Sequence, residues 1–385
     1  MNSVLSAAEI LRELVAIPTP SAVSNLPLLR WVETFLESRG WRVEILPYLD
    51  DNGVEKANLI ARANNRSGSK IDLAFICHTD TVPYTADWPA ALLLEKRNAD
   101  LHGCGACDVK GALACFLAAA SGLGPQEMSQ GVALVLTADE EIGCKGMERL
   151  LAAEEFRGVR IGSAIVSEPT SLRPGIAGKG YGLARITVRG REAHSAFPEQ
   201  GVSAISVAAR LISQIEDAFA TGQPDAASGG LFGLFDPART TLNIGVIEGG
   251  TAKNIIPGRC TFLVEWRALP NEPATDVLNH LEALVYEAKQ TTPEAQIDLE
   301  GLRAEAGFSP ADGGPLRSRL ADNLPAQPVG ISFGSEASRV TRIADEVIVI
   351  GPGDMRTAHS DRECVPIAEL EQWTVTLRDL LQNGI

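Results

Sequence analysis

Four short segments are mostly apolar and rich in β-branched residues, which predicts buried strands. They span Ile71–Cys77, Val132–Thr137, Ile161–Val166 and Val347–Ile350, and the apolar segment Gly111–Leu123 predicts a buried helix. Strands of this kind, separated by helical segments, are typical of an open, mostly parallel sheet. We therefore expect an α/β fold with a mixed, mostly parallel sheet and helices on both faces.

The pattern changes after about residue 180, where half-buried strands and amphipathic helices follow one another. The expected strand–helix–strand–strand–helix–strand order runs through Gly182–Val188, Val202–Phe219, Thr241–Ile247, Arg259–Leu269, Ala274–Ala288 and Ala295–Glu300. This order predicts a small α+β unit of the ferredoxin-like type, inserted into the first domain. We expect residues 1–178 and 301–385 to form one domain and residues 179–300 to form the insertion.

Histidines and carboxylates follow the predicted buried strands, directly or within one loop. In an open parallel sheet, ligands bind outside the carboxyl ends of the strands, so such residues converge although they lie far apart in the sequence. A glycine-rich loop, His102–Cys107, brings a further carboxylate to the same place. The set consists of His78, Asp108, Glu140, Glu141, Glu168 and His359.

Each of these residues has an ordinary structural interpretation when it is taken alone. A histidine after a strand is more often a loop or core residue than a ligand, and a Glu-Glu pair is usually solvated surface. Their joint occurrence favours a metal site, because buried carboxylates are costly unless they are paired or metal-bound. Two imidazoles and three carboxylates form a ligand set for two ions, and a carboxylate remains for acid–base chemistry.

Five short motifs occur in a fixed order along nearly the whole chain. They are His78–Pro83, Gly105–Gly111, Asp139–Gly143, Ser167–Thr170 and Gly351–Asp354, the last one ahead of His359. With these motifs the chain resembles the co-catalytic dinuclear zinc amidohydrolases and peptidases, which include deacetylases, desuccinylases, aminoacylases and glutamate carboxypeptidases. The resemblance implies a zinc-peptidase-like catalytic domain and an inserted dimerisation or lid domain.

The resemblance also implies a role for each residue of the metal site. His78 and Glu168 would hold one zinc ion, Glu141 and His359 would hold the other, and Asp108 would bridge them. Asp80 would orient His78, because a metal-bound histidine usually donates its other ring proton to a carboxylate. The native metal stays open between Zn²⁺, Co²⁺ and Mn²⁺, since all three accept these ligands.

Glu140 is the carboxylate that this assignment leaves free. Two ions about 3.5–4 Å apart lower the pKa of a bridging water and polarise a carbonyl. Glu140 is then expected to take the proton of that water and to return it to the leaving nitrogen. The expected reaction is the hydrolysis of an N-acyl amide by a metal-bound hydroxide.

Three residues of the insertion are candidates through the same resemblance. His194 would reach the neighbouring subunit's site in a homodimer and hold the oxyanion, Arg267 would bind the substrate carboxylate, and Asn254 would lie near that carboxylate. Without the resemblance, His194 is an exposed loop residue, Arg267 pairs with a neighbouring acid, and Asn254 forms a turn. The residues alone leave both interpretations open.

Within the family, the motifs are closest to the members that convert N-acetyl-L-ornithine to L-ornithine and acetate. Glu336 would suit a substrate with a free side-chain ammonium, although Lys179 lacks the histidine that often precedes it in those members. Desuccinylation of N-succinyl-diaminopimelate, broader aminoacylase or dipeptidase activity, and a non-catalytic metal-binding relic of the fold are the alternatives. A relic would not need Glu140.

Composition excludes several other classes of protein. The chain has 34 basic and 49 acidic residues, a net charge of −15, and no basic cluster that could follow a phosphate backbone. No signal segment or membrane span is predicted, so no membrane partner is expected. The resemblance implies that the partners are a small N-acyl amino acid and a second copy of the chain. Seven cysteines, an odd number, indicate reduced thiols in the cytoplasm.

Overall fold

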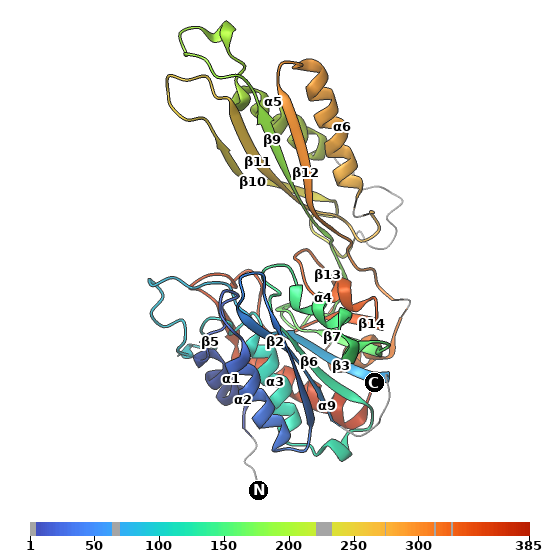
Figure 1. The fold of residues 1–385 in the computed structure, drawn as a ribbon. Coiled ribbons are helices and arrows are strands. Elements are labelled where there is room, and N and C mark those ends of the chain that lie inside the picture. The colour runs from blue at the N-terminus through green and yellow to red at the C-terminus, as the bar shows by residue number, and fades with distance from the viewer. Residues whose placement is uncertain (1–4, 64–69, 221–232, 274, 312, 325) are drawn as a thin grey trace. The chain divides into compact units, whose positions relative to one another are not determined.

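The computed structural model describes residues 5–63, 70–220, 233–273, 275–311, 313–324 and 326–385. The chain divides into two compact units, drawn in Figure 1. The first unit contains Met1–Ile176, Pro310–Val329 and Ser335–Ile385, and the second contains Ala177–Ser309 and Gly330–Gly334.

An eight-stranded mixed sheet forms the centre of the first unit, in the order β1-β2-β6-β3-β7-β14-β8-β13. Its central strands β6, β3, β7 and β14 run parallel, whereas β1 and β2 pair antiparallel at one edge. The bounds are β1 Arg42–Leu49, β2 Glu55–Arg62, β3 Lys70–His78, β6 Val132–Thr137, β7 Arg160–Val166, β8 Gly175–Gly178, β13 Val329–Ile331 and β14 Ala344–Val349. The predicted α/β class and all four predicted strands are confirmed.

Helix α3 (Lys110–Ser121) is the buried helix that the sequence predicts. Eleven of its twelve residues are buried, because α1 (Ala7–Ala16) and α9 (Ile367–Asn383) pack against it. A Cβ atom at Gly111 would lie 2.4 Å from the carbonyl oxygen of Ala106, so only glycine allows the helix to start this close to the preceding loop. The other helices of this unit are α2 Leu26–Glu37, α4 Lys145–Ala152, α7 Pro315–Asn323 and α8 Ala337–Val340.

The second unit has the predicted strand–helix–strand–strand–helix–strand order. Its four-stranded antiparallel sheet has the order β10-β11-β9-β12, and buried and half-buried residues alternate along β11, as expected for a sheet with one face covered by helices. The elements are β9 Tyr181–Arg189, α5 Ala204–Ala220, β10 Thr241–Gly249, β11 Arg259–Arg267, α6 Asp276–Thr291 and β12 Gln296–Glu305. The last strand ends five residues later than predicted, because it stays paired with β9 as far as Tyr181. The predicted helix start at Ala274 lies outside the described residues.

A small three-stranded sheet, β15-β5-β4, was not predicted. It consists of β4 Glu95–Arg97, β5 Asp100–His102 and β15 Cys364–Pro366. Strands of three residues are too short to show a hydrophobic period, and β15 contains a proline. The sheet joins the segment before Asp108 to the segment after His359.

Within the parts of the chain that the structure describes, no helix is long and apolar enough to cross a membrane.

Candidate metal centre

The structure brings the five predicted ligands together in the first unit. His78 ends β3, Glu141 follows β6, Glu168 follows β7, His359 follows β14, and Asp108 lies in the loop between β5 and α3. They form two groups that share Asp108, and in each group the ligand atoms lie within 4.8 Å of one another. One group is His78, Asp108 and Glu168, and the other is Asp108, Glu141 and His359.

Asp108 directs one carboxylate oxygen toward each histidine. Its Oδ1 lies 3.1 Å from His78 Nε2, and its Oδ2 lies 3.1 Å from His359 Nε2. His359 Nε2 is also 3.2 Å from a carboxylate oxygen of Glu141. Ligand atoms that bind one ion at about 2.0–2.2 Å lie about 3–3.5 Å apart, so these separations fit two ions with Asp108 between them.

The orientation of His78 is fixed from the side away from Asp108. His78 Nδ1 lies 2.9 Å from the backbone carbonyl oxygen of Asp80 and 3.6 Å from the Asp80 carboxylate. A carbonyl only accepts, so Nδ1 carries a proton and Nε2 faces Asp108. The nearer partner of His78 is therefore the backbone carbonyl of Asp80, whereas the resemblance implied the Asp80 side chain.

The Asp80 carboxylate instead holds the loop that carries the two glutamates. It accepts hydrogen bonds from the backbone N–H groups of Glu140 (3.1 Å) and Glu141 (3.3 Å) and from the Ser21 hydroxyl (2.7 Å). One side chain thus connects the candidate ligand Glu141 and the neighbouring Glu140 to the end of β3.

A buried ion pair, which could not be predicted from the sequence, supports the same loop. Asp139 adopts a left-handed backbone conformation, with φ of 57°, immediately before Glu140. Lys56 Nζ lies 3.2 Å from its carboxylate, and the Tyr48 hydroxyl donates to it at 2.9 Å. Because Lys56 also donates to the carbonyls of Ser21 and Val23, it joins the loop to the N-terminal segment.

Glu363 is a second residue that the sequence interpretation missed. It is 2% exposed, and its carboxylate accepts hydrogen bonds from the backbone N–H groups of Gly105, Cys107 and Asp108, each at 3.0 Å. The glutamate four residues after His359 therefore holds the loop that carries Asp108. Nothing in the local pattern separates it from a solvated loop glutamate.

The centre has an excess of negative charge. Burial raises the pKa of Glu140 to about 8 and that of Glu168 well above its usual range, and neighbouring carboxylates add to both shifts. Burial opposes protonation of His78, but Asp108 and Asp80 outweigh it and raise the pKa of that imidazole. Hydrogen bonds to Asp108 and Glu141 raise the pKa of His359 to about 10.

The raised pKa values of both imidazoles reflect the surrounding negative charge. Divalent cations bound here would offset the repulsion among the carboxylates. The donor set of imidazole nitrogens and carboxylate oxygens suits zinc, cobalt or manganese. The residues therefore fit a dinuclear metal group.

Glu140 lies beside the centre but belongs to neither ligand group. Its carboxylate lies 3.3 Å from the Cys144 thiol, and the charges of His78 and Glu141 act on it. A carboxylate whose pKa is raised to about 8 can accept and return a proton near neutral pH.

Glu336 also belongs to the first unit, where it precedes α8. It is 1% exposed, and burial raises its pKa to about 7, with the charge of Asp80 acting in the same direction. Its predicted role toward a substrate ammonium stays a prediction.

The other predicted residues lie in the second unit. His194 and Asn254 are both exposed and adjacent, because the Ser195 N–H donates to the Asn254 carbonyl at 3.0 Å. Arg267 donates to Glu265 at 2.7 Å, and its guanidinium lies 4.5 Å from the centroid of the Tyr181 ring. His194 and Asn254 thus share one place on this unit, while Arg267 has a neighbouring acid as a partner.

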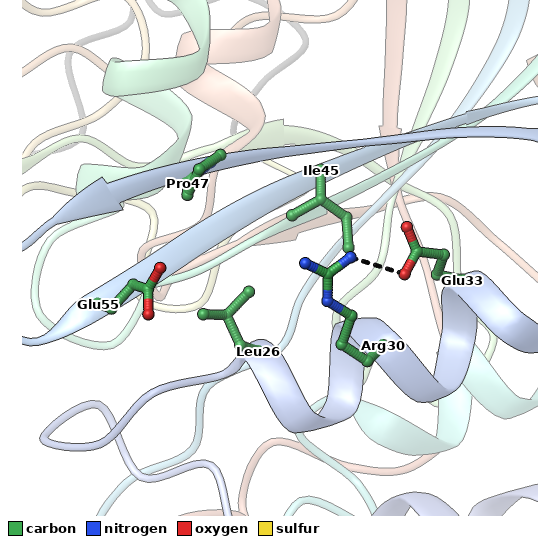
Figure 2. A pocket seen from close by; sticks show the side chains of 6 residues that line it. All are labelled: Leu26, Arg30, Glu33, Ile45, Pro47 and Glu55. Carbon is green, nitrogen blue, oxygen red and sulfur yellow. Dashed lines mark hydrogen bonds and ion pairs between the residues drawn. The ribbon is translucent and has the colours of Figure 1, made fainter.

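A surface pocket lies between α2 and strands β1 and β2 (Figure 2). Arg30 and Glu33 form an ion pair of 2.8 Å at its edge. None of its lining residues is a candidate ligand: they are Leu26, Arg30, Glu33, Ile45, Pro47 and Glu55. This pocket is therefore separate from the candidate metal centre at the strand ends.

Comparison with known proteins agrees with this geometry. Residues 176–293 match the family model described as a peptidase dimerisation domain. The chain is 40% identical over 360 residues to acetylornithine deacetylase of Myxococcus xanthus, covering 94% of this chain and 92% of that protein. It is 28% identical over 387 residues to acetylornithine deacetylase of Proteus mirabilis, covering 97% and 96%.

Solved structures share the fold. A tripeptidase from Staphylococcus aureus superposes with a TM-score of 0.78 at 21% identity, covering 99% of this chain and 98% of that one. A dinuclear metal-binding peptidase of the M20 family from Bacillus subtilis superposes with a TM-score of 0.68 at 15% identity, covering 98% of both chains. On the strength of the Myxococcus relative and the matched dimerisation domain, the chain belongs to the M20 family of metallopeptidases and is a metal-dependent amidohydrolase.

Proposed function

We propose that this enzyme removes the acetyl group from N-acetyl-L-ornithine and releases L-ornithine and acetate. The observation that carries the reaction class is the pair of ligand groups sharing Asp108, with Glu140 free beside them. The proposed substrate is supported by the 40% identical relative, which is named acetylornithine deacetylase.

The proposed cofactor is a pair of Zn²⁺ ions, for which Co²⁺ or Mn²⁺ could substitute. His78 and Glu168 would hold one ion, Glu141 and His359 the other, and Asp108 both. When bound, two such ions supply Lewis acidity toward the amide carbonyl and lower the pKa of a water molecule.

Glu140 performs the proton transfers in this proposal. It takes a proton from the attacking water, and the new carbon–oxygen bond forms at the amide carbonyl. It then gives this proton to the nitrogen as the carbon–nitrogen bond breaks. Asp80, Asp139 and Glu363 act indirectly, because they hold the backbone of the Glu140–Glu141 and Asp108 loops.

The second unit is proposed to serve as the dimerisation and lid domain, with residues 179–300 inserted into a catalytic domain of residues 1–178 and 301–385. The matched peptidase dimerisation domain supports a homodimer. His194 would then hold the oxyanion of the neighbouring subunit, and Arg267 and Asn254 would bind the substrate carboxylate. To bind the substrate carboxylate, Arg267 would have to break its hydrogen bond to Glu265.

Glu336 and the cysteines bear on the substrate and on the compartment. Glu336 would favour a substrate ammonium through its buried negative charge. All seven cysteines are free thiols, which supports a reducing compartment such as the cytoplasm.

A parallel assay tests the substrate. Purified, zinc-loaded enzyme is given N-acetyl-L-ornithine, N-succinyl-L,L-diaminopimelate and N-acetyl-L-methionine, and amine release is measured with and without a chelator. We expect chelator-sensitive turnover with a clear preference for N-acetyl-L-ornithine. Preference for another substrate would overturn the proposed specificity, and no turnover by zinc-loaded protein would favour the non-catalytic alternative.

A further inference from the structure

Asp100, His102 and Cys364 form a group of metal-binding side chains outside the catalytic centre. They lie on the three-stranded sheet, and none of them belongs to the two groups around Asp108. Cys364 of β15 is paired directly with His102 of β5, and Asp100 is two residues before His102. Residues two apart on a strand face the same side, so the three side chains gather on one face.

The donors of this group match one metal ion. A carboxylate oxygen, an imidazole nitrogen and a thiol sulfur lie within 4.8 Å of one another. Zinc binds such atoms at about 2.0–2.3 Å, which places them about 3.3–3.7 Å apart, so small side-chain rotations suffice. Thiolate and imidazole together favour zinc over magnesium or calcium.

His102 provides independent support for a ligand here. Its Nδ1 is buried, and within the described residues it has no hydrogen-bond partner. Buried polar atoms almost always have a partner, and an ion bound through Nδ1 would supply one. Cys364 is the one cysteine of the seven that is not fully buried, which gives an ion access to the thiol.

The position of the group connects it to the catalytic loops. Cys364 directly follows Glu363, whose carboxylate holds the backbone N–H groups of Gly105, Cys107 and Asp108. His102 directly precedes that same loop. An ion bound by both strands would therefore fasten the two segments that carry Asp108 and His359.

We propose that Asp100, His102 and Cys364 form a third metal site, which binds a thiophilic divalent cation such as Zn²⁺ and fastens β5 to β15. The fourth coordination position is left to solvent. The role of this ion is structural and separate from hydrolysis.

Cobalt titration of the metal-free enzyme tests the site without reference to activity. The catalytic ligand set contains no cysteine, so a thiolate-to-cobalt charge-transfer absorption in the near ultraviolet reports on Cys364. We expect three equivalents of Co²⁺ per chain in the wild-type enzyme, with this absorption rising as one of them binds. Two equivalents without thiolate absorption, or a third equivalent without it, would overturn the proposal.

Variants locate the site. Cys364→Ser should lose the absorption and bind two equivalents of Co²⁺. His102→Gln should lower the affinity for the third equivalent by about 10–100-fold or more, since mutation of a residue that only supports a metal ligand already costs this much. Cys260→Ser, at a buried cysteine in β11 of the second unit, is the matched control and should keep both signals. Persistence of the absorption in Cys364→Ser would contradict the assignment.

A measurement on the unmodified enzyme covers the case in which a variant does not fold. Zn²⁺ beyond two equivalents should slow alkylation of Cys364 at least tenfold, as followed by mass spectrometry of its peptide. Equal alkylation rates with and without the added zinc would refute the site.

Discussion

At the scale of single residues, burial raises the pKa values of several carboxylates in and around the candidate centre. Glu140, with a pKa raised to about 8, and Glu336 and Glu363, each raised to about 7, lie above their ordinary values mainly because of burial. The pKa of His359 is also raised, to about 10, by Asp108 and Glu141. Each of these groups therefore binds its proton more tightly in the folded than in the unfolded chain.

These shifts determine the direction in which stability changes with pH. Groups with raised pKa values contribute stability that is full below their unfolded pKa and is lost as the pH rises through the folded pKa. The metal-free protein should therefore unfold at progressively lower temperature between about pH 5 and pH 8. Above about pH 8 the lowered pKa values of Lys110 and Lys179, each about 8, act in the opposite sense. Asp80 and Asp108, whose pKa values are lowered, act in the opposite sense but below this range.

Thermal unfolding over this pH range, with chelator or with excess Zn²⁺, checks the prediction. Bound cations replace the protons, so the zinc-loaded enzyme should show a flatter dependence on pH. A chelated protein that becomes more stable between pH 5 and pH 8 would contradict the account of these groups.

At the scale of elements, Glu363 connects two loops that the central sheet does not hold together. Replacement by alanine leaves three buried backbone donors without an acceptor, at a cost of about 1–3 kcal/mol each. We expect Glu363→Ala to lower the free energy of unfolding by at least about 3 kcal/mol and to weaken metal binding, because the Asp108 loop loses its support.

Glu346→Ala is the matched control for this prediction. Glu346 is also buried and accepts three hydrogen bonds, from the Ser163 hydroxyl and the backbone N–H groups of Leu316 and Arg317. It should lose comparable stability but keep its metal affinity. Denaturant unfolding and calorimetric titration of zinc separate the two effects, and unchanged zinc affinity in Glu363→Ala would show that Glu363 has no positioning role.

Only part of the fold and of the candidate site could be predicted from the sequence. The strands around His78 and Glu168 could be predicted because continuous apolar runs mark buried strands, and parallel strands bring their ends together. Glu363 and the Lys56–Asp139 pair could not, because their partners are backbone groups or residues far away in the chain. The strands of the small sheet could not be predicted, because three residues are too few to show a hydrophobic period.

At the scale of the whole molecule, the proposed homodimer makes a catalytic prediction through His194. If His194 serves the neighbouring subunit, a mixture of Glu140→Ala and His194→Ala chains forms heterodimers with one intact site. Unfolded and refolded together in equal amounts, two inactive variants should regain about a quarter of wild-type activity, as random pairing in a two-fold dimer requires. Each variant refolded alone is the control, and a mixture no more active than its components would rule out the action of His194 across the dimer.

The central claim is that a metal-dependent hydrolysis depends on Glu140 as the proton carrier. The most direct test measures bound zinc and turnover of Glu140→Gln beside the wild-type enzyme, on whichever acyl amino acid the wild type cleaves best. We predict that the variant binds as much zinc as the wild type while kcat falls by about 10²–10⁴-fold, the usual contribution of a positioned general base. Near-wild-type turnover with full zinc occupancy would contradict the account, since Glu140 would then carry no proton in the reaction.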